Sequence, residues 1–276
     1  MSHVAILYDR DQVGAAAADR IATILRQALA DQDRVRVIFA AAPSQTETLA
    51  TLVATDGIDW GRIEAFHMDE YLGLPPDHPA GFANWLDAHL FSLVPLRAVH
   101  RIVPGNNPEQ VASDYAKLLQ TAPIDLVVGG IGETGHLAFN DPAVADFNDR
   151  LAVKIVELDV QSRRQQVEEA CFPSLDQVPT HAITVTIPPL MAARSIVCVV
   201  PGAHKRAAVT AALTGPVTVA CPASILQTHP DVDIFVDRAA GADLLLAKPV
   251  GMTSAVYPKP KECRPATSQA TLDTER

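Results

Sequence analysis

A strand-like apolar run followed by a glycine-rich turn constrains the fold of this chain more than any other feature. Residues 124–128 are short, mostly apolar and β-branched, which is typical of a buried parallel strand. Four glycines follow within residues 129–135, so the backbone can turn sharply at the strand's carboxyl end and approach a ligand closely. Because open α/β sheets bind ligands at this edge, the segment predicts a ligand site that includes His136 and Asp141. The alternative is a turn without a functional role.

Helix-like and strand-like patterns alternate along the rest of the chain. Strand patterns occupy residues 35–40, 124–128, 153–158, 181–187, 195–200 and 232–236, and another begins near 63. Helical spacing occupies residues 13–29, 49–53, 82–91, 107–119, 161–170 and 239–247, and a further helix starts near 206. This alternation predicts an α/β fold with a single, doubly wound, mostly parallel sheet and helices on both faces, as in Rossmann-like proteins. We expect residues 1–256 to form one domain and residues 257–276 to form a polar, mobile tail.

Composition narrows the possible partners and the cellular compartment. The net charge of −10 provides no general basic field for nucleic acid or for an anionic membrane. No run approaches the roughly 20 apolar residues that a membrane span requires. The four cysteines are scattered, without the spacing of a metal site, which is typical of reduced thiols. We therefore expect a cytoplasmic protein without a metal site.

Two adjacent carboxylates mark the end of the strand that begins near residue 63. Asp69 and Glu70 follow an apolar stretch and precede a loop rich in glycine and proline. A carboxylate partly shielded from water there is suited to act as a base. The alternative is that either acid caps a helix or pairs with an arginine.

Hydroxyl and basic side chains near two helix starts are candidates for anion binding. Ser44 and Thr46 precede the helical pattern at residues 49–53, and helix starts with free N–H groups are natural phosphate sites. Lys205 lies at the start of another helix, where charge and backbone could hold a phosphate together. The alternatives are a plain helix cap and a solvated surface cation.

Four motifs in a fixed order carry a family resemblance. They are FHMDEY at 66–71, GIGETGHLAFNDP at 130–142, PGAHK at 201–205 and PASILQTH at 222–229. Over residues 4–246 the sequence resembles the glucosamine-6-phosphate deaminase/isomerase family, whose superfamily also contains 6-phosphogluconolactonases. The lactonases share the glycine–histidine stretch but lack the Met-Asp-Glu-Tyr block, so the block favours the deaminase branch.

The resemblance implies catalytic roles for particular residues. Asp69 matches the general base that moves a proton between C2 and C1 of the opened amino sugar, with Glu70 beside it in a structural or orienting role. His136 matches the imidazole that opens the sugar ring, and Asp141 would orient it. Thr134 stands where the deaminases usually have aspartate.

The resemblance also implies how the substrate is held. Lys205 and Arg163 would bind phosphate, Ser44 and Thr46 belong to the phosphate loop, and Gly132 and Gly135 would bring the backbone to the substrate. The implied reaction is ring opening, aldose–ketose isomerisation through an enolamine and release of ammonia, with no cofactor. An oligomeric assembly is also implied.

Three departures from the family pattern bear on this assignment. Thr134 cannot act as a carboxylate, and Asp141 replaces the usual glutamate with an acid one methylene shorter. The phosphate loop lacks its glycine and contains Glu47, which we expect to repel a phosphate.

Two other functions remain open from the sequence. One is hydrolysis of a sugar-phosphate lactone with His136 as the base, which would leave Asp69 unused. The other is a sugar-phosphate-binding module that has lost turnover.

Overall fold

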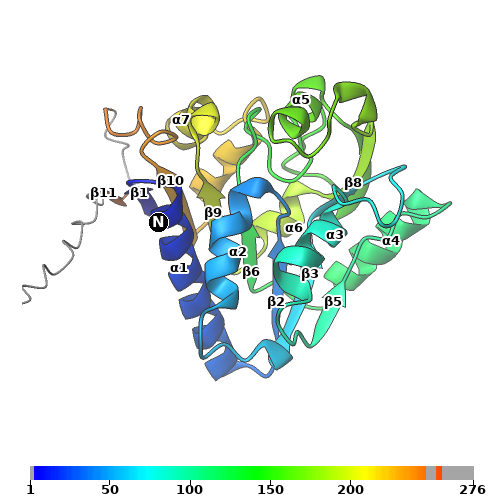
Figure 1. Cartoon of the computed structure of the whole chain (residues 1–276), viewed down its shortest axis with the longest axis horizontal. Coiled ribbons are helices and arrows are strands. Elements are labelled where there is room, and N and C mark those ends of the chain that lie inside the picture. The colour runs from blue at the N-terminus through cyan, green and yellow to red at the C-terminus, as the bar shows by residue number, and fades with distance from the viewer. Residues whose placement is uncertain (1–2, 247–252, 257–276) are drawn as a thin grey trace, which may run out of the picture.

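The main sheet is parallel throughout, and the carboxyl ends of its strands lie at the top in Figure 1. The computed structural model describes residues 3–246 and 253–256. Within these residues the strand order is β11-β1-β10-β9-β6-β2-β3-β5. The strands are β1 (His3–Leu7), β2 (Val35–Phe39), β3 (Ile63–His67), β5 (Ala98–His100), β6 (Leu126–Gly129), β9 (Ser195–Val200), β10 (Val232–Asp237) and β11 (Thr253–Val256). The predicted doubly wound, parallel α/β sheet is confirmed.

Helices cover both faces of this sheet because alternate strand side chains point to opposite sides. Val37 and Phe39 pack in one core cluster with α1 (Arg10–Asp31), α2 (Thr46–Val53) and α3 (Phe82–Leu86). Ile38 packs in the other cluster with α4 (Pro108–Leu119), α6 (Ile187–Met191) and α7 (Arg206–Thr214). No helix in the described part of the chain is both long and apolar enough to cross a membrane.

A second, antiparallel sheet lies beside the carboxyl edge of the first. It contains β4 (Asp69–Tyr71), β8 (His181–Val185) and β7 (Val153–Glu157) in that order. Met68 alone separates β4 from β3, and Asp69 pairs with Thr184 in the small sheet. The Thr184 hydroxyl also accepts a hydrogen bond from the backbone N–H of Phe139, at 3.0 Å. The prediction of one sheet was wrong for residues 153–158 and 181–187, because a strand pattern does not reveal its partner.

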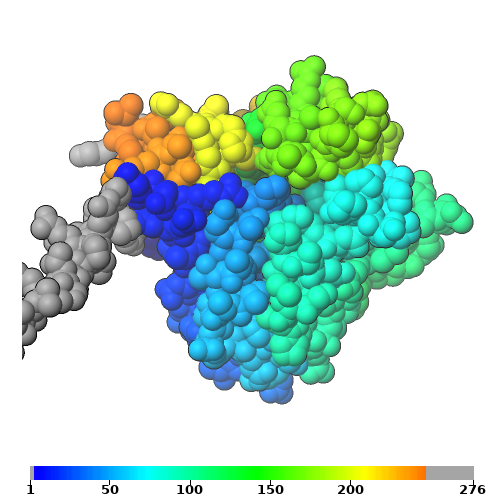
Figure 2. Space-filling view, in the orientation of Figure 1, coloured from blue at the N-terminus to red at the C-terminus, as the bar shows by residue number. Residues whose placement is uncertain are grey.

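One further helix and several short helical turns complete the fold. Helix α5 (Val160–Glu168) lies above the strand ends (Figure 1). In the space-filling view, the green-to-orange second half of the chain forms the upper part of the molecule and the blue-to-cyan first half forms the lower part (Figure 2). The short turns are η1 (Pro43–Gln45), η2 (Trp60–Arg62), η3 (Asp87–Phe91), η4 (Leu175–Gln177), η5 (Ala203–Lys205) and η6 (Pro222–Thr228).

The predicted helix at 239–247 was wrong for the residues that the structure describes, because residues 238–246 form turns. The Asp237 carboxylate accepts from Ala240 N, and its carbonyl accepts from Gly241 N. A Cβ at Gly241 would lie 2.9 Å from the Val236 side chain, so the turn requires glycine for close packing. Ala247 and the predicted tail at 257–276 lie outside the described residues.

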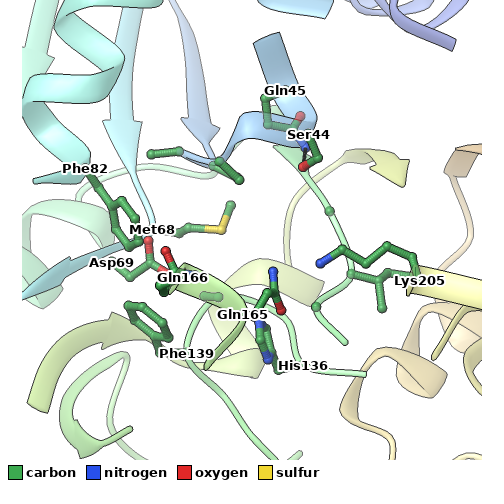
Figure 3. A pocket seen from close by; sticks show the side chains of 17 residues that line it. Ser44, Gln45, Met68, Asp69, Phe82, His136, Phe139, Gln165, Gln166 and Lys205 are labelled. Carbon is green, nitrogen blue, oxygen red and sulfur yellow. Dashed lines mark hydrogen bonds between the residues drawn. The ribbon is translucent and has the colours of Figure 1, made fainter. Parts of the chain in front are cut away.

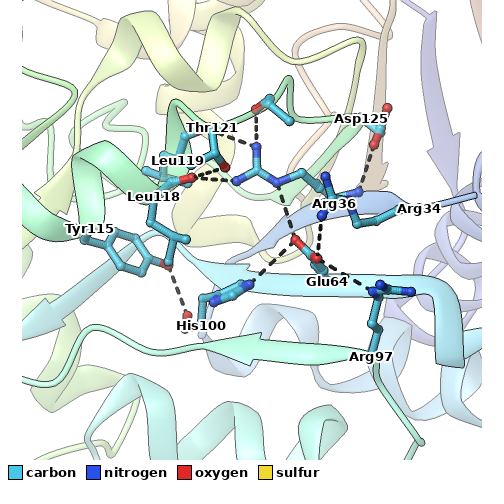
Figure 4. Close-up of polar contacts among 11 residues, drawn as sticks. Arg34, Arg36, Glu64, Arg97, His100, Tyr115, Leu118, Leu119, Thr121 and Asp125 are labelled. Carbon is cyan, nitrogen blue, oxygen red and sulfur yellow. Dashed lines mark hydrogen bonds and ion pairs between the residues drawn. The ribbon is translucent and has the colours of Figure 1, made fainter.

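A buried arginine joins elements at the opposite, amino-terminal edge of the sheet (Figure 4). The Arg36 side chain donates to the carbonyls of Leu118 and Leu119 at the end of α4, at 2.8 and 3.1 Å. It also donates to the carbonyl of Ala122. Its Nε lies 3.7 Å from a carboxylate oxygen of Glu64. The cation therefore satisfies the last carbonyls of a helix, where positive charge is favourable.

We expect Arg36→Met to lower the free energy of unfolding by about 2–4 kcal/mol, because it leaves the buried carbonyls that Arg36 satisfies without this donor. The measurement is urea unfolding followed by circular dichroism. Arg34→Met is the matched control, since Arg34 makes an exposed ion pair to the same Glu64 at 3.2 Å. Such exposed pairs contribute about 0–1 kcal/mol. Equal losses in the two variants would contradict this role for Arg36.

Candidate active site

A pocket opens at the carboxyl ends of β2, β3 and β6, in agreement with the edge expected from the sequence (Figure 3). Its lining comes from the segments after these strands, from α5 and from η5. Five of the predicted site residues line it, namely Ser44, Asp69, Gly132, His136 and Lys205. Figure 3 places Asp69 and Lys205 on opposite sides of the cavity.

The imidazole of His136 is held from behind by a buried carboxylate. His136 Nδ1 lies 2.9 Å from Asp141 Oδ1, and Asp141 is 1% exposed. The hydroxyls of Thr134 and Ser162 donate to the same oxygen, at 2.7 and 2.6 Å. Both hydroxyl oxygens also lie within 3.1 Å of His136 Nδ1. Since Nδ1 faces the carboxylate, it carries a proton, and Nε2 is left free to exchange one with a substrate.

The charge of Asp141 is secured by these contacts. Burial alone would raise the pKa of Asp141, but hydrogen bonds and charge from His136, with the Ser162 and Thr134 hydroxyls, outweigh it and lower the pKa to about 2. Thr134 therefore supplies a hydrogen bond to the carboxylate that orients the imidazole, although it carries no charge itself.

Two glycines in the turn make room for this arrangement. A Cβ at Gly132 would lie 1.9 Å from His136 Nε2, so the ring occupies the space that a side chain at this position would need. Gly135 has φ +79°, a conformation that favours glycine, and a Cβ there would lie 2.7 Å from the Cys221 sulfur. Gly132 lines the pocket, whereas Gly135 shapes the turn behind it.

Asp69 is a buried carboxyl whose side chain faces the pocket (Figure 3). It is 6% exposed. Burial, together with the neighbouring Glu70 charge, raises the pKa of Asp69 well above its usual range. A carboxyl group with a raised pKa, placed at a cavity wall, is suited to accept and return a proton near neutral pH.

The neighbouring acid, Glu70, has a structural role in this geometry. Its carboxylate accepts hydrogen bonds from the backbone N–H groups of Tyr71 and Phe82, both at 3.0 Å, and Ala83, at 2.8 Å. Two of these donors lie in the first turn of α3. Glu70 therefore caps that helix, which is the structural alternative weighed for this pair of acids.

The segment after β2 brings a hydroxyl to the pocket and keeps its carboxylate away. Ser44 lines the pocket, whereas Thr46, the first residue of α2, does not. Glu47 does not line the pocket either, and its carboxylate pairs with Arg10 at 2.5 Å. The expected repulsion between Glu47 and a bound phosphate is therefore weakened by an ion pair outside the cavity.

Arg163 does not reach the pocket. Its guanidinium donates to the carbonyls of Leu175 and Val178, at 2.7 and 2.8 Å. These bonds tie α5 to the η4 turn. The expectation that Arg163 binds phosphate therefore has no support in this geometry.

The face of α5 that meets the site carries residues the sequence reasoning missed. Ser162, Gln165 and Gln166 are buried, and both glutamines line the pocket. Together with Glu169 they follow the spacing i, i+3, i+4 and i+7, which places four polar side chains on one helix face. The sequence signal for these residues was a helix face made only of polar side chains, which is unusual on a helix that packs against the rest of the protein. Arg163 does not lie on this face.

The described residues contain no group of three His, Cys, Asp or Glu side chains that could hold a metal ion.

A parallel α/β sheet with a histidine–carboxylate pair and a buried acid at its carboxyl edge is the arrangement of an enzyme that uses acid–base catalysis, and the comparisons identify its family. The family model for glucosamine-6-phosphate isomerases/6-phosphogluconolactonase matches residues 8–234. The chain belongs to this family.

Named relatives and solved structures extend this result. The chain is 33% identical to a glucosamine-6-phosphate deaminase of Exiguobacterium sp., over 82% of this chain and 87% of the relative. It is 34% identical to one of Arthrobacter sp., over 88% and 93%. A monomeric glucosamine-6-phosphate deaminase has the same fold, with TM-score 0.78 and 24% identity over 86% of this chain and 98% of that one. A 6-phosphogluconolactonase from Thermotoga maritima aligns with TM-score 0.69 and 20% identity, over 86% and 100%.

Proposed function

We propose that this chain is an amino-sugar-phosphate deaminase/isomerase that converts glucosamine 6-phosphate, or a related hexosamine phosphate, to the matching ketose phosphate and ammonia. The observation that carries the proposal is the buried Asp69 carboxyl at a pocket that also contains His136. Lactone hydrolysis needs one base, His136, to activate water, and it includes no proton transfer that Asp69 would carry out. The names of the relatives support the same reaction.

The reaction has a ring-opening step, assigned to His136, and an isomerisation step, assigned to Asp69. His136 Nε2 moves a proton between the anomeric hydroxyl and the ring oxygen, which opens the pyranose. The Asp69 carboxylate then takes the proton from C2 while O1 gains a proton, giving an enolamine, and returns its proton to C1 as the amine nitrogen loses one. The resulting C2 imine adds water and releases ammonia, leaving the ketose carbonyl at C2.

Ammonia release from a panel of phosphorylated and unphosphorylated amino sugars, including glucosamine 6-phosphate, tests this proposal. Release from at least one member, with the matching ketose formed in equal amount, is the expected result. Hydrolysis of 6-phosphogluconolactone without ammonia release from any amino sugar would favour the lactonase. Ligand binding without either reaction would favour a binding module.

We expect Gly132→Ala to reduce ammonia release by about 10²-fold, because the added methyl group takes the place of the His136 ring and a displacement of about 1 Å can have this effect. Steady-state kinetics measure the loss, and circular dichroism checks that the fold is kept. Gly105→Ala is the matched control, since a Cβ there meets nothing within 4 Å. Wild-type turnover in Gly132→Ala would show that the imidazole position is not critical.

We also propose that residues 1–256 act as one domain, that the protein works in the cytoplasm, and that it binds neither nucleic acid nor membranes. The net charge of −10 supports the last point. A homo-oligomer is proposed from the resemblance alone, and analytical ultracentrifugation tests it.

A further inference from the structure

The side of the pocket opposite Asp69 has little net positive charge. Among the described residues that line the pocket, Lys205 is the one lysine or arginine. Its side chain extends toward the cavity in Figure 3, and the residue is 3% exposed. A phosphate dianion placed here would therefore depend on this ammonium group for its ionic contact.

That ammonium group already has an anionic partner. Lys205 Nζ lies 3.6 Å from Glu169 Oε1, and the Glu169 side chain is 14% exposed. The same oxygen accepts a hydrogen bond from Gln165 Nε2 at 2.7 Å, and Gln165 itself lines the pocket. His204 Nε2, at 4.0 Å, is the other basic nitrogen near it and belongs to a side chain that is 45% exposed.

Neighbouring arginines do not add positive charge to the Lys205 side of the pocket. Arg163 bonds to backbone carbonyls, and Arg10 pairs with Glu47. Burial lowers the pKa of Lys205, although the charges of Glu169 and Glu133 act in the opposite direction. The Glu169 carboxylate beside this single lysine reduces the net attraction for the charge of a phosphate, whereas an uncharged hydroxymethyl group is not affected.

We propose that Glu169 is a specificity-determining residue that neutralises Lys205, so that the site accepts unphosphorylated amino sugars nearly as well as their 6-phosphates. This inference rests on the proposed deaminase function. Glu169 acts on the distal group of the substrate and takes no part in the proton transfers at C1 and C2.

The test compares kcat/KM for glucosamine 6-phosphate and for glucosamine in the wild type, in Glu169→Gln and in Glu168→Gln. The glutamine at 169 keeps an oxygen that can accept the Gln165 hydrogen bond and removes only the charge. We expect the two substrates to differ by less than about tenfold in the wild type. Glu169→Gln should favour the phosphate by a further tenfold or more through KM, since one unit charge is removed near it.

Glu168 is exposed on the same helix, and Glu168→Gln should leave the ratio unchanged. A wild-type preference for the phosphate above about tenfold, or a ratio that is unaltered in Glu169→Gln, would overturn the inference. If no amino sugar releases ammonia, the proposed function fails separately. Calorimetric binding of inorganic phosphate to the wild type and to Glu169→Gln then still decides the role of Glu169: tighter binding by the variant supports it, and equal binding overturns it.

Discussion

Asp69→Asn should abolish most ammonia release, with kcat reduced by about 10³-fold or more. General base catalysis contributes roughly 10²–10⁴-fold, and an amide cannot accept the C2 proton. Because the substitution is nearly isosteric, substrate binding should change little. Steady-state kinetics on the active amino sugar measure kcat, and solvent hydrogen exchange at C2 reports the proton transfer directly.

The same variant should be more thermostable than the wild type at neutral pH. The pKa of Asp69 is raised in the folded protein by burial and by Glu70, so ionising Asp69 is less favourable in the folded than in the unfolded state. The destabilisation by Asp69 in the wild type is present above the pKa that Asp69 has in the unfolded chain, and it disappears as the pH falls below that pKa. Melting temperatures at pH 7 and pH 3.5 check this sign, and a full kcat in Asp69→Asn would remove Asp69 from the mechanism.

Asp141→Asn should reduce kcat by on the order of 10³-fold, because an amide no longer holds His136 in the tautomer that leaves Nε2 free to accept a proton. The three donors that now converge on Asp141 Oδ1 would also lose their anionic acceptor. KM should change less than kcat, since Asp141 lies behind the imidazole and away from the cavity. Stopped-flow measurement of ring opening would separate this step from isomerisation.

The pH dependence of the stability change in Asp141→Asn is opposite to that in Asp69→Asn. The folded pKa of Asp141 is about 2, below its usual 3.8, so its ionised form stabilises the fold above the unfolded pKa. This contribution is lost as the pH falls from about 4 through 2.

Asp149→Asn is the control for the effect of Asp141→Asn on kcat, because Asp149 is also ion-paired, to Lys154 at 2.7 Å, but does not line the pocket. It should keep wild-type kcat, and an equal loss of kcat in both variants would contradict the special role of Asp141.

The sequence predicted β2, β3, β6, β9 and β10 of the main sheet because each of these strands has its own local pattern, whereas β1 and β5 were not predicted. The run before Gly129 and the helix spacing in α1 and α4 both depend on residues close in the chain. The partner of a strand depends on distant residues, so the pairing of β8 with β4 and β7 was not predictable from these patterns.

The site shows the same division between local and distant information. His136 and Asp141 follow the end of β6 in one continuous turn, and the geometry of this turn depends on its glycines. Ser162 reaches Asp141 from α5, and Glu169 reaches Lys205 from the end of the same helix. For Arg163 the family pattern favoured phosphate, whereas the helix phase turns its side chain toward η4.

The single residue between the two sheets has a consequence for local unfolding. Since Met68 alone joins β3 to β4, the small sheet cannot separate from the main one without moving Asp69. Thr184 pairs with Asp69 and also holds the loop of His136 through Phe139 N. We therefore expect the amide protons of Asp69 and Phe139 to exchange with deuterium in one cooperative opening, so that the two proposed catalytic groups, Asp69 and His136, lose and regain their positions together.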